Sequence, residues 1–428
     1  MKVLIIDTTH GGDVLAMEYA SMDNEVTCVD CYGTSRSEVR EELVAKGIRW
    51  LSSPPEEDFD LLLMPVHCPD DFISGARFEA RRTFHQAVGE LASFKGLTFE
   101  VTGVKGKTST CHVISHMMNR LGRKVLQLTS RGIHLYGEEE ETLEERSSIA
   151  PTSILRISRM ETEFDNGVFE VSLGGTGLAD VAIITTIGDN YPIAAGTRTA
   201  FDAKKQMLNM ARKVAVVPEE ERELWTPQVP PGVWLTTFGE EGIVDAYIDG
   251  PHELGEEVEV KFRVKPGGEF STRFSGEFLV PAYLRPFSAA ISALKSLGIP
   301  PPQLCEVLSD FNGVPGRGEV LQERDTWIVR DRNPGVSVHS VEYLLGILEE
   351  YYEAKDIGLV IEPVSIRVCE KLDLTELGTI NEVHDSVTGA YLLDHSGKEV
   401  EGFRNIQDLS EILDDHGILL HCTKEGYL

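Results

Sequence analysis

A glycine loop between an apolar strand and a helix constrains the fold of this chain more than any other feature. Residues 97–102 are the apolar strand LTFEVT, residues 103–108 are the loop GVKGKT, and an amphipathic segment continues to position 121. Gly103 and Gly106 lack side chains, so backbone N–H groups can approach phosphate oxygens, and the start of a helix adds partial positive charge. The stretch predicts a parallel α/β sheet with a phosphate site at a strand end.

The side chains of this loop match those that bind ATP. The loop is two residues shorter than the GxxxxGK[ST] pattern, but its Gly-Lys-Thr run is kept. Lys107 is expected to reach the β- and γ-phosphates, and Thr108 or Ser109 to hold Mg²⁺. The preceding strand and the following helix satisfy the context of the motif. The expected nucleotide contacts are Gly103, Val104, Lys105, Gly106, Lys107, Thr108 and Ser109.

Length and pattern predict an α/β protein of three domains. A chain of 428 residues is too long for one hydrophobic core. We expect a small Rossmann-like domain at 1–96, a central P-loop domain with a β insertion at 97–313, and a third α/β domain at 314–428. His10 and Gly11 follow the first strand, where parallel sheets bind ligands, so they are candidate substrate contacts. A simple tight turn is an equal alternative.

Composition limits the partners and the compartment. The 40 basic and 70 acidic residues give a formal charge of −30, which argues against a nucleic-acid groove. Apolar runs fall short of the ~18 residues of a membrane span, and the N-terminus resembles a strand and turn rather than a signal peptide. Seven scattered cysteines fit a reducing compartment, so we expect a cytoplasmic protein. Metal or redox use of the lone CxxC pair, Cys28 and Cys31, is an open alternative.

Three polar segments are expected to be helical or irregular. Residues 75–94 are predicted as a helix, on which Arg77, Arg81 and His85 would form a basic stripe. Such a stripe is either a solvated face or a contact for an anionic substrate. The acidic segment 137–148 is expected to be an exposed loop or a short helix, and 406–417 a helix.

The compact loop brings a family into view. TGVKGKTS at 102–109 resembles the ATP loop of Mur ligases and folylpolyglutamate synthetases, which join an ATP-activated carboxylate to a nucleophile. The segment APTSILRIS that follows the acidic stretch resembles a Mur ligase segment facing the reacting groups. The resemblance implies substrate contacts at Thr152 and Ser153, and it implies ATP and Mg²⁺ as cofactors.

The resemblance extends to the metal-binding positions. Glu170 ends a strand before Gly-Gly-Thr-Gly, where the family has a Mg²⁺-binding glutamate, and oxygen ligands suit this cation. Asn190 stands where the family has a metal-binding histidine. Lys204 matches the family's carbamylated lysine, which also binds metal. The resemblance therefore implies Lys107, Glu170 and Lys204 as catalytic residues; a Glu170 ion pair and an ordinary surface Lys204 are the alternatives.

The last domain keeps part of the family pattern. Arg317 matches a hinge arginine and Asn333 lies in an Asn-Pro-x-x-Ser element, so both are expected at ATP. The adenine asparagines are replaced by Tyr283 and Pro286. Arginines are candidates to pair substrate carboxylates because their planar fork matches carboxylate geometry. The candidates are Arg77, Arg81, Arg317, Arg330 and Arg332.

The departures taken together resemble an archaeal branch of the superfamily that acts in nickel-tetrapyrrole synthesis. This implies a small anionic substrate, a nickel tetrapyrrole, one of whose carboxylates is activated by ATP before a carbocyclic ring closes. An amide-forming ligase that adds an amino acid is one alternative. A P-loop switch or metallochaperone that holds nickel at His112 and His116 is another.

Overall fold

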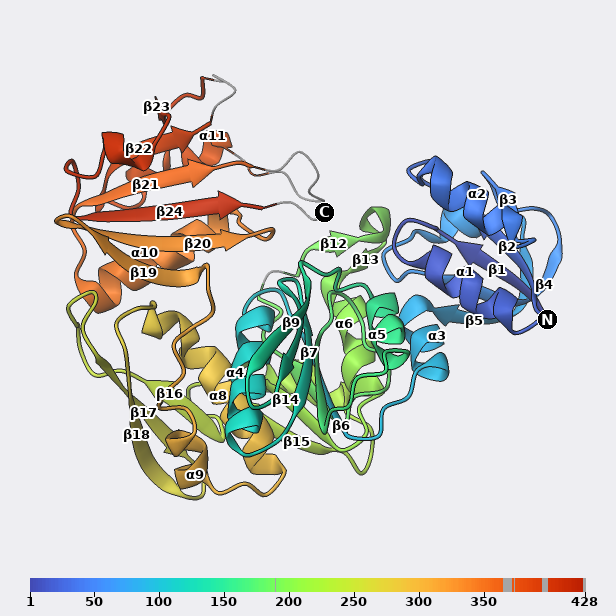
Figure 1. The fold of residues 1–428 in the computed structure, drawn as a ribbon, viewed down its shortest axis with the longest axis horizontal. Helices are drawn as coiled ribbons and strands as arrows, with labels where there is room; N and C mark the ends of the chain where they lie inside the picture. The colour runs from blue at the N-terminus through green and yellow to red at the C-terminus, as the bar shows by residue number, and fades with distance from the viewer. Residues whose placement is uncertain (189, 365–371, 373, 395–398, 426–428) are drawn as a thin grey trace. The chain divides into compact units, whose positions relative to one another are not determined.

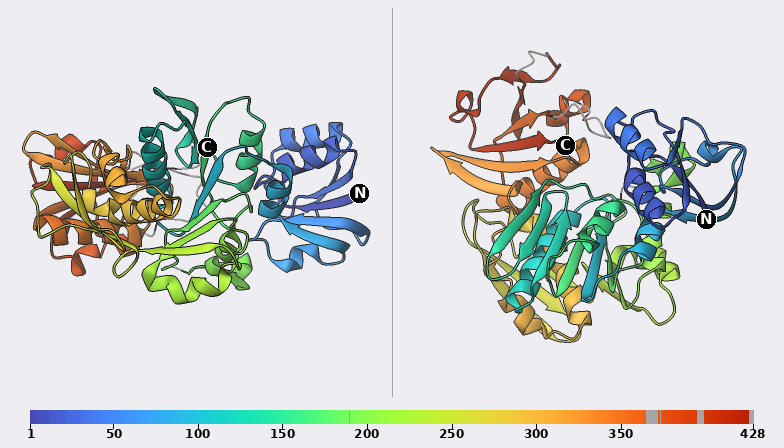
Figure 2. Two further views of the ribbon diagram at one scale, coloured as in Figure 1. Left: turned by 90° about the horizontal axis from the view of Figure 1, so that it is seen from below. Right: turned by 45° about the vertical axis from the view of Figure 1, so that its right-hand side comes forward.

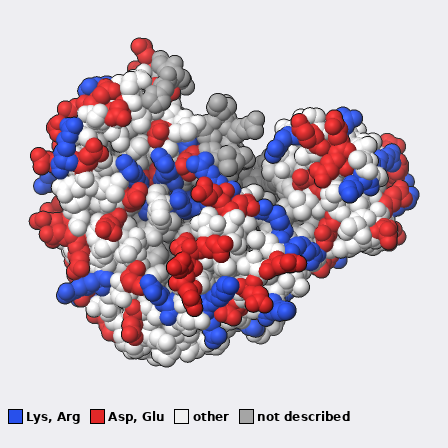
Figure 3. Space-filling model, viewed as in Figure 1, with Lys and Arg blue, Asp and Glu red and all other residues white. Residues whose placement is uncertain are grey.

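The computed structural model describes residues 1–188, 190–364, 372, 374–394 and 399–425. The chain folds into two compact units, which are described separately. The first comprises Met1–Ile243 and Ala289–Ile299, and the second comprises Val244–Ser288 and Pro300–Leu428. Acidic and basic side chains are interspersed over the face drawn in Figure 3. Among the described helices none is long and apolar enough to cross a membrane.

The first unit begins with a five-stranded parallel sheet in the order β3-β2-β1-β4-β5. Its helices lie on one side of the blue strands in Figure 2, and apolar residues of α1 and α3 pack there with those of β1 and β4. The sheet confirms the predicted Rossmann-like start. The elements are β1 (Lys2–Ile6), α1 (Gly12–Ser21), β2 (Glu25–Val29), α2 (Ser37–Ala45), β3 (Arg49–Leu51), β4 (Asp58–Met64), η1 (Asp70–Ile73), β5 (Arg77–Thr83) and α3 (Phe84–Leu91).

A second sheet of this unit carries the glycine loop. Its strands run in the order β15-β14-β11-β6-β10-β7-β8-β9, parallel from β15 to β7. Helix α4 lies on one side of the sheet and α5 and α6 on the other (Figure 1). The elements are β6 (Leu97–Thr102), α4 (Lys107–Arg120), β7 (Val125–Thr129), β8 (Gly132–Tyr136), β9 (Glu140–Glu145), α5 (Pro151–Ser158), β10 (Asn166–Glu170), β11 (Val181–Ile184), β12 (Pro192–Ile193), β13 (Arg198–Thr199), α6 (Ala200–Asn209), β14 (Val214–Pro218), α7 (Arg222–Trp225) and β15 (Trp234–Phe238).

The predicted basic helix at 75–94 is wrong in its first half. Residues 77–83 form β5, which pairs in parallel with β4, and the helix begins only at Phe84. Arg77 and Arg81 bind Asp58 and Asp70 at 2.6 and 2.7 Å, so they do not share a helix face with the buried His85. The reason is a capping box between Thr83 and Gln86, which fixes the helix start after the strand.

That capping box allows a stability prediction. The Thr83 hydroxyl accepts the Gln86 N–H at 3.1 Å and the Gln86 side chain accepts the Thr83 N–H at 2.9 Å. Thr83→Ala leaves an N–H of the first turn unpaired and should lower the free energy of unfolding by about 1 kcal/mol. Urea unfolding followed by circular dichroism measures it. Thr83→Ser keeps the acceptor and is the control; equal losses in both variants would contradict the capping role.

The acidic segment 137–148 is also not a loop or helix as predicted. Its residues Glu140–Glu145 form β9, which pairs antiparallel with β8 at the edge of the second sheet. An edge strand has a neighbouring strand on one side only and is exposed to water on the other. It therefore tolerates the acidic residues that led to the prediction of a loop or helix. The preceding β8 supplies the apolar partners, including buried Ile133 and Leu135.

The second unit contains the predicted β insertion and the C-terminal sheet. Strands β16, β17 and β18 pair antiparallel as expected, whereas VWLTTFG is the parallel strand β15 of the first unit. The C-terminal sheet has the order β19-β20-β24-β21-β22-β23, with α10 packed on one face. The elements are β16 (Val244–Tyr247), β17 (Val258–Val264), β18 (Gly268–Phe274), α8 (Leu284–Ser296, which belongs to the first unit from Ala289 on), α9 (Pro301–Glu306), β19 (Arg317–Glu323), β20 (Thr326–Asn333), α10 (Val338–Tyr352), β21 (Ile357–Glu362), α11 (Leu374–Leu377), β22 (Val387–Leu393), β23 (Arg404–Ile406) and β24 (Ile418–Lys424).

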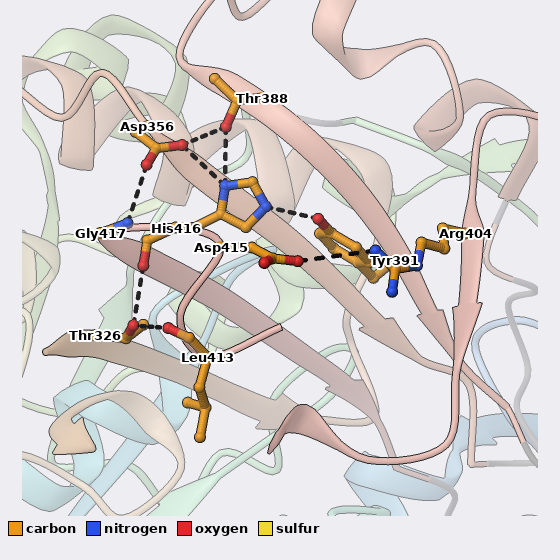
Figure 4. Close-up of polar contacts among 9 residues, drawn as sticks. All are labelled: Thr326, Asp356, Thr388, Tyr391, Arg404, Leu413, Asp415, His416 and Gly417. Atoms are coloured by element: carbon orange, nitrogen blue, oxygen red, sulfur yellow. Dashed lines mark hydrogen bonds and ion pairs between the residues drawn. The ribbon is translucent and has the colours of Figure 1, made fainter. Parts of the chain in front are cut away.

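A hydrogen-bond network around His416 holds the start of β24 (Figure 4). Its Nδ1 lies 2.9 Å from Asp356 and 3.0 Å from Thr388, and its Nε2 lies 2.7 Å from the Tyr391 hydroxyl. Burial would raise the pKa of Asp356, but hydrogen bonds from Thr388, His416 and the Gly417 N–H lower it. The network links β21, β22 and β24, and it gives this buried histidine a structural task.

The same network explains why 406–417 is not the predicted helix. Only Leu409–Glu411 forms a short 3-10 turn, η7, which Asp408 caps. The Thr326 hydroxyl donates to the carbonyl groups of both Leu413 and His416. The Leu413 carbonyl, which a continuous helix would use for the Gly417 N–H, is therefore taken by a contact to Thr326.

Candidate functional site

The glycine loop is held between the ends of β6 and β11. Gly103 has a φ of 145°, and a Cβ there would collide with the Thr185 side chain, so both conformation and space require glycine. The Val104 N–H donates to Thr186 O at 2.9 Å, and the Thr185 hydroxyl donates to Lys105 O at 2.5 Å. Two neighbouring strand ends thus fix the loop, and α4 begins at Lys107 directly behind it.

Thr108 and Glu170 form a hydrogen bond next to this loop. The Thr108 hydroxyl donates to a carboxylate oxygen of Glu170 at 2.9 Å, and the Ser130 N–H donates to the same oxygen at 3.1 Å. Two oxygens in adjacent octahedral positions about 2.05 Å from Mg²⁺ would lie about 2.9 Å apart. The buried pair therefore fits an octahedral hard cation, and Glu170 has no Arg or Lys partner among the described hydrogen bonds and ion pairs.

Lys204 is buried beside the same strand ends. Its side chain is 0% exposed, and its Nζ donates to Ser172 O at 2.6 Å and to the Thr102 hydroxyl at 3.2 Å. Burial and then the charge of Lys107 lower the pKa of the Lys204 amine well below its usual value, although Glu170 acts in the opposite direction. This shift favours the neutral amine, and because Lys204 is buried the alternative of a surface lysine is wrong.

Lys107 lies at the first position of α4, partly exposed, with its Nζ 3.4 Å from Val104 O. Its charge acts on both Lys204 and the neighbouring buried thiol of Cys111. One electrostatic environment at the loop therefore contains four residues that lie up to 97 positions apart in the sequence, namely Lys107, Thr108, Glu170 and Lys204. Phosphoryl transfer depends on this kind of charge placement.

Several residues of this site were missed by sequence reasoning. Thr102 ends β6, Ser130 follows β7, and Ser172 lies just beyond β10. Each lies at the carboxyl end of a parallel strand. Because ligands bind at this edge of a parallel sheet, the predicted strand ends could have identified these residues. Glu221 was also missed; it accepts hydrogen bonds from the Thr186 hydroxyl and the Ile187 N–H, both at 2.8 Å, and so holds the end of β11.

Asn190 has a different local task. It is exposed, and its side-chain oxygen accepts the Phe201 N–H at 2.8 Å near the start of α6. Within the described residues its carboxamide makes no hydrogen bond to Thr108, Glu170 or Lys204. Its role as a metal ligand stays a prediction.

The predicted substrate residues of the first sheet partly come together. Gly11 has a φ of 98° and packs so closely on Thr152 that a Cβ would collide with its hydroxyl. Thr152 and Ser153 are buried in the first turn of α5. His10 binds Asp7 at 2.5 Å, and this contact raises the pKa of the His10 imidazole despite partial burial. Burial would raise the pKa of Asp7, but the imidazoles of His10 and His67 lower it to about 2.

The predicted residues of the C-terminal sheet form a local group in the second unit. Asn333 donates to Asp331 at 2.7 Å and accepts the Gly335 N–H at 2.8 Å. Burial raises the pKa of Asp331, while the charge of Arg317 opposes this shift. Arg330 is half-buried, and Arg332 is exposed with its Nε 3.6 Å from Glu425. Their roles at ATP or substrate stay predictions.

Comparison with known proteins decides the family. A model described as the Mur ligase middle domain matches residues 101–284. A coenzyme F(430) synthetase of Methanosarcina acetivorans is 32% identical over 99% of this chain and 98% of its own length. The chain belongs to the Mur ligase superfamily. A coenzyme F(430) synthetase of Methanocaldococcus jannaschii is 25% identical over 93% of the chain and 96% of its own length.

A solved structure agrees on the fold of this Mur ligase. The MurF ligase of Thermotoga maritima in complex with ADP superimposes with a TM-score of 0.60 at 16% identity, over 93% of this chain and 91% of that one. The three-domain, α/β Mur ligase architecture predicted from the sequence is confirmed, and the chain is an ATP-dependent ligase.

The Thr108–Glu170 pair leads to a prediction about Mg²⁺. Glu170→Gln keeps the size of the side chain but removes the negative charge beside Thr108, so the concentration of Mg²⁺ needed for half-maximal ADP release should rise about tenfold or more. Titration of Mg²⁺ at saturating ATP measures this. Glu140→Gln, on the exposed edge strand β9, is the control. An unchanged Mg²⁺ requirement in Glu170→Gln would contradict the assignment.

Proposed function

We propose that this ligase activates a carboxylate of a nickel tetrapyrrole as an acyl phosphate and closes a carbocyclic ring on the macrocycle, the last step of coenzyme F(430) biosynthesis. The observation that carries this proposal is the similarity to a coenzyme F(430) synthetase along 99% of the chain. The match covers all three domains, including the C-terminal one that in amide-forming relatives of the superfamily would receive the amino acid.

The proposed reaction has two steps. A substrate carboxylate oxygen attacks the γ-phosphorus of ATP, the bond to the β-phosphate oxygen breaks, and ADP leaves. A carbon atom of the same substrate then loses a proton and attacks the acyl carbon, and inorganic phosphate leaves as the carbon–carbon bond forms. No second organic substrate enters this reaction.

Three residues of the glycine-loop site and the backbone of the loop carry the first step in this proposal. Lys107 orients the β- and γ-phosphates, and backbone N–H groups of the loop bind them. Thr108 and Glu170 hold Mg²⁺, whose charge offsets that of the phosphates when it is bound. The 2.9 Å spacing of their oxygens supports this assignment. The remaining loop residues, Val104, Lys105 and Ser109, stay predicted contacts.

Lys204 is proposed to act as a carbamate. Only a neutral amine attacks CO₂, and burial lowers the pKa of this amine and so favours that form. Attack forms the N–C bond and releases one proton, so the side chain changes from neutral to anionic. An anion beside Lys107 and near the metal ligands is electrostatically favourable, and its oxygens suit Mg²⁺. Ser172 O and the Thr102 hydroxyl, which now bind Nζ, position the nitrogen.

The other sequence-based assignments are kept as part of the proposal. The predicted arginines are proposed to pair with the tetrapyrrole carboxylates that do not react. One of these arginines, Arg81, lies in the first sheet and binds Asp70. Arg198 binds the same Asp70 carboxylate, at 3.2 Å. The domain limits at 96/97 and 313/314, the adenine contacts and a cytoplasmic location likewise remain predictions.

The experiment that tests the proposal is ADP release by purified protein with ATP and Mg²⁺. The seco nickel tetrapyrrole is added first alone and then with a mixture of amino acids. Release with tetrapyrrole alone, and a product that absorbs as the closed macrocycle, is the expected result. Release only when amino acids accompany the acceptor would replace the proposal by an amide ligase. Nickel binding at His112 and His116 without turnover would instead indicate a metallochaperone.

A further inference from the structure

A cluster of metal-binding side chains lies at the carboxyl edge of the first sheet, outside the ATP site. Asp7 follows β1, and His67 and Cys68 follow the adjacent strand β4. One ligand atom from each of these three residues lies within 4.8 Å of the other two. The described part of the chain holds no other group of three such side chains in this arrangement. Because it joins two strand ends, the cluster depends on the fold rather than on a local motif.

Of the three donor atoms, His67 Nε2 has no hydrogen-bond partner among the described residues. Asp7 Oδ2 is bound by His10 Nδ1 at 2.5 Å, and Cys68 Sγ lies 3.5 Å from the Tyr32 hydroxyl. The Nε2 of His67 lies 3.7 Å from Asp7 Oδ2, which is too long for a hydrogen bond. Asp7 and Cys68 are 0% exposed. Nitrogen, oxygen and sulfur ligands at tetrahedral positions around zinc lie about 3.3–3.7 Å apart. The cluster therefore needs only small movements to close on an ion.

Neighbouring groups support the same geometry. His10 binds Asp7 Oδ2 through Nδ1 at 2.5 Å, as a histidine does when it orients a ligating carboxylate from outside. The Thr9 N–H donates to the other oxygen of Asp7 at 2.8 Å. Cys31, at the end of β2, contacts Cys68 through its thiol and places a second sulfur beside the cluster. The CxxC partner Cys28 is buried with the core residues of the opposite face of the sheet, so Cys28 and Cys31 do not act as a pair.

We propose that Asp7, His67 and Cys68 form a binding site for a divalent transition ion of the zinc class. A mixed thiolate, imidazole and carboxylate set selects zinc over Mg²⁺ or Ca²⁺, which take oxygen ligands. Cobalt is a spectroscopic substitute because it accepts the same tetrahedral ligands. The site shares no residue with the Thr108–Glu170 pair, and it does not depend on the proposed ring closure.

The test uses full-length protein purified by anion exchange, without a metal-affinity step. The protein is stripped with a chelator, and Zn²⁺ and Co²⁺ are titrated by calorimetry and absorption. One equivalent per chain and a sulfur-to-cobalt charge-transfer band are expected. Cys68→Ser should abolish the band, and His67→Ala should weaken Zn²⁺ binding at least tenfold, because removal of one of three ligands costs this much or more. Cys28→Ala is the matched control and should keep both the charge-transfer band and the Zn²⁺ affinity.

Two results would overturn the site. One is a charge-transfer band of equal strength in Cys68→Ser; the other is unchanged Zn²⁺ affinity in His67→Ala. Folding of each variant is checked by circular dichroism. Where Cys68→Ser does not fold, Asp7→Asn replaces it. Asp7 has a φ of 72°, a conformation that asparagine also adopts, so this variant keeps the backbone and loses only the anionic ligand. Wild-type affinity in Asp7→Asn would likewise overturn the site.

Discussion

Lys107→Ala is expected to lower ATP-dependent ADP release by about 10³-fold, with the fold unchanged. Lys107 is the loop cation at the start of α4, and its charge acts on the same site as Glu170 and Lys204. Cations that stabilise the transferring phosphoryl group act mainly in the transition state, and one such group contributes 10²–10⁵-fold. The loss should therefore appear in kcat as well as in kcat/KM.

The comparison that isolates this effect uses a second lysine of the same domain. Lys124 is exposed just before β7, at the opposite end of the parallel strands from the glycine loop. Lys124→Ala removes the same charge from the protein and should leave turnover within about twofold, because exposed single charges contribute little. Steady-state ADP release and circular dichroism of both variants measure the result. A Lys107→Ala enzyme with near wild-type kcat would show that the loop lysine has no part in phosphoryl transfer.

The parts of the fold that the sequence predicted are those where hydrophobic pattern and local chemistry agree. Strand β6, the loop and α4 could be placed because the glycines, the Lys-Thr pair and the apolar helix face indicate the same structure. Glu170 could be placed because a strand pattern ends at its position. The antiparallel β insertion likewise follows from alternating residues and glycine turns.

The failures occur where pairing partners decide the structure. Segment 77–83 has few apolar residues and could be a helix or strand, and only its pairing with β4 makes it β5. The acidic β9 depends in the same way on β8. The cluster of Asp7, His67 and Cys68 was missed for a related reason, because its members follow two different strands; Cys31 likewise contacts Cys68, 37 positions away, rather than Cys28. Short-range spacing does not contain that information.

Lys204→Met is expected to lower turnover by about 10²- to 10³-fold by removing an anion from the metal site. The direction of the expected pH dependence follows from the pKa of the Lys204 amine. Burial lowers the pKa of the Lys204 amine, which favours the neutral form that reacts with CO₂. As the pH falls through this lowered pKa the amine gains a proton, the carbamate is lost, and turnover should fall. Methionine has similar length but cannot form the carbamate at any pH.

The adjacent Lys205 provides the matched control for this variant. Its Nζ binds Asp202 at 3.0 Å on the partly exposed side of α6, so Lys205→Met should keep wild-type turnover. Incubation with ¹³C-bicarbonate should give a carbamate signal by NMR in wild type and Lys205→Met but not in Lys204→Met. Removal of CO₂ should lower wild-type turnover, and bicarbonate should restore it. Full turnover of Lys204→Met, or a wild-type enzyme without the ¹³C signal, would contradict a carbamate and leave Lys204 as a buried amine that positions Thr102 and the backbone at Ser172.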